Sequence, residues 1–146
     1  MLVVAAVLVY ISIRMLNPLE GQSFQQAERL RNDLRHIQML AMTWNRELRL
    51  SVAGGSYSVA CVTGGAAPCN ANPVIDPATG KGFSVALEAG FTLNGPGFTL
   101  DFDALGRPKN AALPNPSFIT SSATFSIVGS PRQVRVAPVT GFATVQ

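Results

Sequence analysis

The chain begins with a continuous apolar segment, followed by a polar stretch in which apolar residues recur regularly. Residues 1–13 are apolar apart from Tyr10 and Ser12. Between residues 22 and 50, apolar side chains recur at steps of three or four, which places them on one face of a helix. The members of this stripe are Phe24, Ala27, Leu30, Leu34, Ile37, Ala41, Trp44 and Leu48. The pattern predicts one long helix over residues 2–51, with the stripe half buried.

Breaks in this helix are predicted from proline and glycine. Pro18 removes one helical hydrogen bond and clashes with the preceding turn, so we expect a kink or a loosened turn beside it, with Gly21 adding freedom. Phe24 and the apolar segment before it should project free of the rest of the molecule. Gly54 and Gly55 offer the left-handed conformation that closes a helix, and we place its end just before them.

After Gly55 the pattern changes to short runs of β-branched and aromatic residues, which are typical of strands. Gly, Pro and Asn clusters separate the runs, and the cluster at residues 94–97 marks a turn. The predicted strands are residues 57–62, 83–87, 91–93, 98–102, 118–119, 124–128, 133–137 and 141–145. The fold class is therefore α+β, with a long N-terminal helix, first hydrophobic and then amphipathic, packed on a C-terminal antiparallel β domain.

Charge is scarce, at 13% of residues with a net charge of +3, against an average of about 25% charged residues. Most of the arginines lie on the predicted helix, interleaved with Glu28, Asp33 and Glu47. This favours a solvated helix face with local ion pairs; a basic surface for nucleic acid or anionic lipid is the alternative. The low charge of the β region suits a surface that packs against copies or partners.

The apolar start is shorter than the roughly 20 residues that a membrane-spanning helix needs. No basic region precedes it, and no small-residue cleavage site follows it, so it does not read as a secretory signal. We interpret it as a membrane segment whose beginning is missing. A short buried core helix is disfavoured, because no part of the run has a polar face. Residues 1–21 then form a membrane or fibre-core half-helix, and residues 22–146 form a globular domain.

Cys61 and Cys69 lie close together in a loop that is rich in Gly, Ala and Pro. Their spacing closes easily as a disulfide and matches no common pair of metal ligands. A disulfide indicates an oxidising compartment outside the cytoplasm. Two unrelated buried thiols are the alternative.

Few residues suggest catalysis. His36 is the sole histidine and has no nucleophile at a suitable spacing. Asp101 and Asp103 alternate along a predicted strand, so both carboxylates share a face where they could hold a cation or transfer protons. We favour a structural role, with Asp103 accepting hydrogen bonds from the turn at residues 104–106. No phosphate loop, zinc motif or nucleotide fingerprint is present. We predict no catalytic, cofactor or metal residues, and no enzymatic activity.

A small basic patch is the remaining candidate site. Arg132 and Arg135 lie near the C-terminus, and Arg107 and Lys109 lie in a loop. These four cations could contact nucleic acid. No aromatic residues are interleaved with them in the sequence, although single-stranded nucleic acid favours such stacking platforms.

Three segments resemble a known family, in the order in which that family carries them. Residues 27–42 (AERLRNDLRHIQMLAM) are similar to the helix of minor pilins from the mannose-sensitive haemagglutinin pilus system. Residues 100–108 (LDFDALGRP) are similar to a Phe-Asp-x-x-Gly-Arg-Pro turn, and residues 134–141 (VRVAPVTG) to a terminal strand with a Thr-Gly turn. The chain thus resembles the type IV pilin-like family, and within it the minor pilins and pseudopilins of the H-like kind. The Gly-Phe-Thr-Leu-x-Glu processing motif is missing.

The resemblance implies a subunit that spans the inner membrane once, with its β domain in the periplasm. It then enters a pilus or pseudopilus by burying its apolar helix among other pilin subunits, because lipid or protein must cover that segment. We expect a structural minor subunit of a type IV pilus or type II secretion pseudopilus that initiates or caps assembly. Two alternatives remain, a DNA-binding minor pilin used in uptake and a membrane-anchored periplasmic protein unrelated to fibres.

Overall fold

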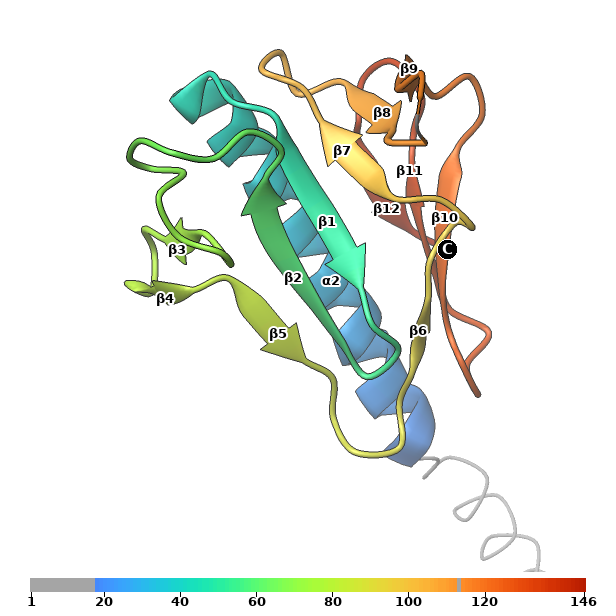
Figure 1. The fold of residues 1–146 in the computed structure, drawn as a ribbon. Helices are drawn as coiled ribbons and strands as arrows, with labels where there is room; N and C mark the ends of the chain where they lie inside the picture. The colour runs from blue at the N-terminus through green and yellow to red at the C-terminus, as the bar shows by residue number, and fades with distance from the viewer. Residues whose placement is uncertain (1–17, 113) are drawn as a thin grey trace, which may run out of the picture.

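A computed structural model describes residues 18–112 and 114–146, in which one long helix packs against antiparallel sheets (Figure 1). The helix, α2, spans Pro18–Trp44. This arrangement confirms the predicted α+β fold class. The apolar segment of residues 1–17 and the kink predicted beside Pro18 lie outside the described residues. Within them, α2 continues through Gly21 without a break.

The strands are short and form two main sheets and one small ribbon. They are β1 (Leu48–Val52), β2 (Ser56–Cys61), β3 (Ile75–Asp76), β4 (Lys81–Gly82), β5 (Ser84–Ala86), β6 (Leu93–Asn94), β7 (Leu100–Phe102), β8 (Pro108–Asn110), β9 (Ser117–Phe118), β10 (Ala123–Ile127), β11 (Gln133–Val136) and β12 (Ala143–Val145). One sheet has the order β5-β2-β1-β7-β8-β9, the second has the order β12-β11-β10-β6, and β3 pairs with β4. Neighbouring strands are antiparallel throughout.

The helix ends earlier than the sequence pattern predicted. Asn45 adopts a positive φ of 53°, its N–H donates to the Met42 carbonyl, and the Arg46 N–H donates to the Ala41 carbonyl. These two bonds form a Schellman cap, in which asparagine takes the left-handed position that glycine more often fills. The helix prediction for residues 45–51 was therefore wrong, because the stop signal is Asn45 and not the glycines that follow.

The segment misassigned to the helix is a strand near the centre of the larger sheet. In β1, Leu48 and Leu50 point into the core while Arg49 and Ser51 alternate outward. This is the period of two that a half-buried strand requires. Leu48 thus belongs to the β core and not to the helical stripe. Strand β1 pairs with β2 on one side and β7 on the other.

The turn cluster at residues 94–97 carries the chain between sheets. Strand β6 pairs with β10 in the smaller sheet, whereas β7 pairs with β1 and β8 in the larger one. The two predicted strands that flank the cluster are therefore not hairpin partners. The other predicted strands exist with shifts of a residue or two. Strands β3, β4 and β8 were missed because Ile75 is the sole β-branched residue in them and none of their residues is aromatic.

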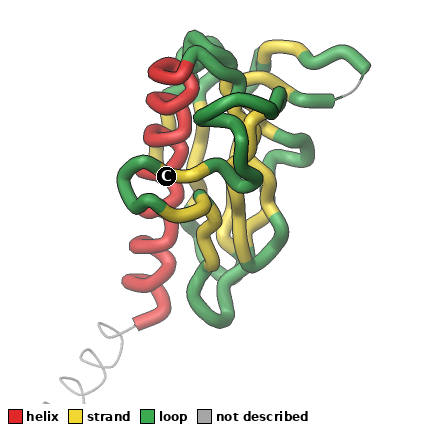
Figure 2. The backbone as a smooth tube through the Cα atoms, turned by 60° about the vertical axis from the view of Figure 1, so that its left-hand side comes forward, coloured by secondary structure: helices red, strands yellow, loops and turns green. Residues whose placement is uncertain are grey.

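The apolar stripe of α2 faces the sheets along its length, as predicted. Ala27, Leu30, Leu34, Ile37 and Ala41 are all buried, and they join both sheets in one core with Phe102, Phe125 and Val134 among its members. Trp44 packs against this core but remains partly exposed. Figure 2 shows the helix lying along one side of the strands, and residues that face away from them, such as Met39, are exposed.

Between residues 18 and 146, α2 lacks the length of apolar sequence that would be needed to cross a membrane. Its described part is the amphipathic half of the predicted helix, with Phe24 exposed on its surface as expected.

Replacement of Leu34 by alanine tests this packing. Leu34 is fully buried, so Leu34→Ala should lower the free energy of unfolding by about 2–5 kcal/mol. The matched control is Met39→Ala on the exposed face of the same helix, which should change it by about 0.5 kcal/mol or less. Chemical denaturation of both variants measures the difference, and equal effects would contradict the described orientation of the helix.

Candidate functional site

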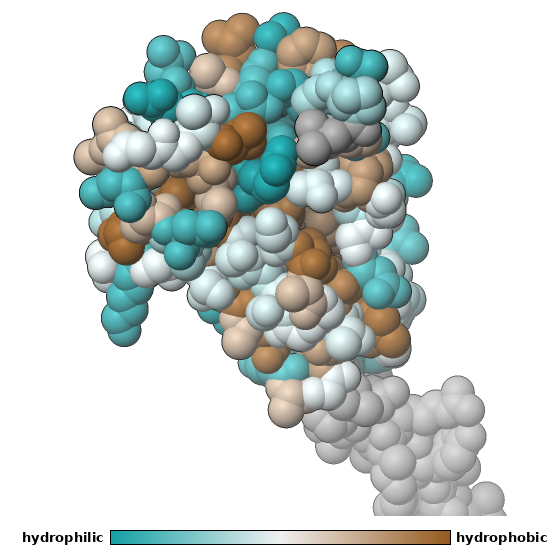
Figure 3. Space-filling model, viewed as in Figure 1, coloured by the Kyte–Doolittle hydropathy of each residue, from teal (hydrophilic) through white to brown (hydrophobic). Residues whose placement is uncertain are grey.

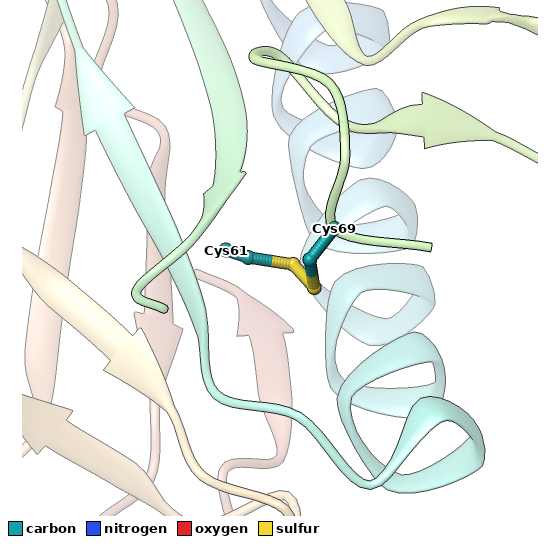
Figure 4. The surroundings of a disulfide bond; sticks show 2 residues. All are labelled: Cys61 and Cys69. Atoms are coloured by element: carbon teal, nitrogen blue, oxygen red, sulfur yellow. A yellow bond between two sulfur atoms is a disulfide. The ribbon is translucent and has the colours of Figure 1, made fainter. Parts of the chain in front are cut away.

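The predicted disulfide between Cys61 and Cys69 is present (Figure 4). Cys61 is the last residue of β2, and Cys69 lies in the loop that follows, with their Cα atoms 5.6 Å apart. The Gly65 N–H donates to the Cys69 carbonyl, so the closed loop also carries a backbone bond. The disulfide therefore closes a short loop at the start of the longer connection between β2 and β3.

Asp101 and Asp103 each have a cationic partner, which gives both a structural role. Arg49 donates from Nε and Nη2 to the two oxygens of the buried Asp101 carboxylate, at 2.9 and 2.8 Å. Asp103 Oδ1 accepts from the Leu105 and Arg107 N–H groups, and its Oδ2 accepts from Arg107 Nε. The turn role proposed for Asp103 is confirmed. Residues 18–112 and 114–146 contain no group of three or more His, Cys, Asp or Glu suited to a metal ion.

His36 joins the helix to the β3–β4 ribbon. Its Nε2 lies 2.8 Å from Asp76 Oδ1, and Asp76 also accepts from the Ala78 N–H and the Thr79 hydroxyl. Burial acts to raise the pKa of the Asp76 carboxyl, but these hydrogen bonds outweigh it and hold that pKa below its ordinary value. His36 is thus a link between helix and ribbon, with no nucleophile in contact with it.

A second acid on the same flank of α2, Asp33, is half-buried. Tyr57 of β2 donates its hydroxyl proton to Asp33 Oδ2. Burial raises the pKa of Asp33, and the Tyr57 hydrogen bond only partly offsets that rise. The pKa of Tyr57 is also raised, first by burial and then by the Asp33 charge. Two helix–sheet hydrogen bonds, through Asp33 and His36, therefore fix this flank of the helix on the larger sheet and the ribbon.

The four cations of the predicted basic patch are divided between two regions. Arg107 pairs with Asp103, and Lys109 pairs with Glu47 at 2.6 Å, both at the larger sheet. Arg132 lies over the Phe24 ring near the start of the described helix, and Arg135 projects from β11 of the smaller sheet. The structure therefore supplies each of the first two with its own carboxylate and does not gather the four into one cluster.

Arginine–phenylalanine stacking is the feature that sequence reasoning missed. Three exposed rings each carry a guanidinium, from Arg35 over Phe142, Arg107 over Phe118 and Arg132 over Phe24, at 4.2 to 5.4 Å. In each pair the arginine and the phenylalanine lie more than ten positions apart in the sequence. The local pattern of residues therefore gives no sign of the stacking. Such stacks cover apolar rings with a hydrated head group and are worth about 0.5–1 kcal/mol at exposed sites.

A hollow of about 580 Å³ lies between the two main sheets. Its floor consists of Leu50, Leu93, Leu100 and Phe125, and none of its lining residues has an ionisable side chain. It offers no acid, base or nucleophile. The face seen in Figure 3 mixes hydrophobic and hydrophilic residues in small areas. A smaller hollow of about 240 Å³ is lined by Arg29, Asp33, Asp76, Thr79 and Lys81, among others, on the flank where the helix meets the ribbon.

Comparison with known proteins gives one structural match. The fold is similar to the crystal structure of the type IV minor pilin FimU from Pseudomonas aeruginosa (strain PAO1), with a TM-score of 0.54 and 16% sequence identity. The match covers 86% of this chain and 87% of that chain. No family model and no curated protein matches the sequence. At this identity the likeness establishes a shared fold, a helix packed on antiparallel sheets.

Removal of the disulfide should destabilise the domain without unfolding it. Because the closed loop is short, the Cys61→Ser, Cys69→Ser double variant should lose about 2–3 kcal/mol of stability. Thiol labelling of the native protein under denaturing, non-reducing conditions is the direct check. Two reactive thiols per chain in material from an oxidising compartment would show that the bond does not form there.

Stability should depend on Asp76 in a pH-dependent way. Its lowered pKa means that its stabilisation is present above the unfolded pKa of about 3.9 and is lost as the pH falls through the folded value. At pH 7, Asp76→Asn should be less stable than the parent by about 1 kcal/mol, and the gap should narrow below about pH 4. Denaturation of both proteins across pH tests this, with Glu88→Gln on an exposed loop as the control. A gap that is unchanged at low pH would contradict the ionic role.

Proposed function

We propose that this chain is a structural, non-enzymatic subunit of a type IV pilin-like fibre, held in the assembly by its N-terminal helix. One observation carries the proposal: the apolar run of residues 1–13 leads in sequence into a helix whose own apolar face is already covered by the β domain. The stripe that packs on the sheets begins with Ala27. The apolar residues at the start of the sequence precede this stripe, and we infer that another partner covers them.

The energy available from that segment is large. Burial of each large aliphatic side chain contributes about 1.5–3 kcal/mol, and residues 1–13 hold several Leu, Val and Ile side chains. Before assembly the inner membrane would cover them, and in a fibre the equivalent helices of neighbouring subunits would do so. The shared fold with a type IV minor pilin is consistent with this route.

We place the β domain in the periplasm and the subunit in a minor position, where it initiates or caps a type IV pilus or a type II secretion pseudopilus. The disulfide suits an oxidising compartment. DNA binding stays an untested prediction, and the separation of Arg107 and Lys109 from Arg132 and Arg135 gives it no added weight.

A charged residue placed in the apolar run tests whether this segment, and not the β surface, holds the subunit in the fibre. In a deletion strain, Val7→Asp should abolish membrane retention and fibre incorporation, because an ionised group at the centre of a bilayer costs about 2.5–3.5 kcal/mol. Val7→Leu is the matched control and should behave as the parent. Fractionation and analysis of sheared fibres provide the readout, and normal incorporation of Val7→Asp would refute the proposed role of the helix.

The alternative function, DNA binding during uptake, can be tested in the same deletion strain. The Arg132→Ala, Arg135→Ala variant should assemble normally under our proposal. Loss of DNA uptake in this variant, together with salt-dependent weakening of DNA binding by the purified protein, would favour the uptake function instead.

A further inference from the structure

Three segments that are distant in sequence meet beside the last turns of α2. Gln38 Nε2 donates to the carbonyl oxygens of Gly106, at 2.8 Å, and Thr140, at 2.6 Å. One helix side chain thus holds both the turn after β7 and the turn between β11 and β12. These are the two turns that the resemblance singled out, and the sequence gives no sign that they touch.

The junction is closely packed around its two glycines, most of all around Gly141. A Cβ added to Gly141 would lie 2.6 Å from Gln38 Nε2 and 2.7 Å from the Gly106 carbonyl oxygen, and one at Gly106 would lie 3.0 Å from Met42 Sδ. Both glycines also have positive φ, which a Cβ disfavours. The two turns are therefore held in a defined position on the helix.

Around this rigid junction the apolar side chains point outward. Five of the ten large hydrophobic residues that are exposed in the described part of the chain gather here, with 47–70% of each exposed. We call them the helix–turn patch: Met39, Met42, Leu105, Val139 and Phe142. Met39 and Met42 are neighbours on one helix face by their spacing of three. Such gathering of exposed apolar groups marks an interaction surface.

Backbone strain singles out the same place. Val139 has a φ of 67° and its side chain is 70% exposed. A β-branched residue in the left-handed region is a conformational outlier that costs about 1–3 kcal/mol and is retained mainly at functional sites. Glycine would adopt this conformation without that cost, and the valine instead places an exposed apolar side chain at the tip of the turn.

The charge over the patch indicates the chemistry of the partner. The Arg35 guanidinium lies 4.4 Å from the centre of the Phe142 ring. Arg35 forms no ion pair among the described residues, and residues 1–17 contain no Asp or Glu. A matching surface would therefore present a carboxylate beside apolar side chains.

The opposite end of the domain shows that this fold can present such a surface. Glu20 lines a hollow of about 350 Å³ together with Phe91, Val128 and Pro131, where the helix leaves the domain. We call this the helix-exit end. Glu20 and Met39 are 19 positions apart on one helix, or roughly 28 Å at 1.5 Å per residue. The two surfaces therefore cannot meet within one domain, but they can meet between domains stacked head to tail.

We propose that the helix–turn patch binds the helix-exit end of a neighbouring subunit of the same architecture, with Arg35 opposite the neighbour's carboxylate. Such a contact joins two different surfaces, and contacts of this type build open filaments. The patch is small compared with the roughly 800 Å² per partner of a stable interface. It therefore works only where another contact already holds the neighbour close. In this respect the inference rests on the proposed function, because the N-terminal helix supplies that tether.

Photo-crosslinking in intact cells tests the contact. A crosslinking residue at Met39 of the full chain should yield an adduct to a subunit of this architecture, and the crosslinked peptide should come from that subunit's helix-exit end. The control position is Ile75 in β3, which is similarly exposed but lies on the flank that His36 faces. An adduct to lipid, to DNA or to any other protein, or equal adducts at both positions, would overturn the proposal.

Two substitutions distinguish binding from folding. Val139→Gly should leave the domain as stable as the parent or more so, since it relieves the left-handed strain, yet it should reduce the Met39 adduct. Arg35→Glu should reduce the adduct about tenfold, which corresponds to about 1.4 kcal/mol, whereas Arg35→Lys should retain most of it. Unchanged adduct yields in Val139→Gly and Arg35→Glu would refute the patch.

Failure of this inference can be told from failure of the proposed function. If the full chain is found in sheared fibres but Met39 forms no adduct, the fibre role stands and the patch is refuted. If the chain is absent from fibres and Val7→Asp behaves as the parent, the proposed function is refuted, and so is the patch contact that rests on it.

Discussion

The structure depends on the burial of one helical stripe between two sheets. Neither main sheet closes on itself, and the inner faces of both are covered by α2 through Ala27, Leu30, Leu34, Ile37 and Ala41. The helix gains most of its stability from this contact, because helices in proteins are stabilised mainly by tertiary packing of an amphipathic face. Helix and sheets thus require one another. This single contact fixes which side of the helix is covered and which side, including Met39 and Arg35, faces outward.

The same constraint explains why the helix can serve two partners along its length. Its described part gives its apolar face to the β domain, and polar contacts at His36 and Asp33 hold one flank in place. Gln38 does so on the other flank by holding two turns. The domain therefore presents the helix as a fixed element. A subunit joined to a fibre by its N-terminal segment would in this way carry its β domain at a set orientation.

Sequence patterns were sufficient for the helical stripe, the disulfide and most strands, because each of these depends on residues close in the chain. The stripe repeats at helical spacing, and Cys61 and Cys69 flank one loop. The end of the helix was missed because Asn45 is a weaker stop signal than the Gly pair. The alternation of apolar and polar residues from Leu48 to Leu50 is typical of a strand and could have indicated the earlier end. Tertiary contacts were beyond such reasoning.

The contacts that define the surface illustrate that limit. Nothing local links Gln38 with Gly106 and Thr140, or Arg35 with Phe142, since the partners are separated by about seventy residues or more. The four cations of the predicted basic patch are likewise divided between the regions of β8 and β11, which belong to different sheets, and the sequence alone does not show this. Charge pairs such as Arg49 with Asp101 likewise become visible only once the strand register is known.

We propose above all that this chain is a fibre subunit held by its N-terminal segment. Quantitative mass spectrometry of fibres sheared from intact wild-type cells tests it most directly, with the membrane and periplasmic fractions measured in parallel. We expect to find the chain both in the inner membrane and in the sheared fibres. Recovery of the full-length chain only as a free protein in the periplasmic fraction would contradict it.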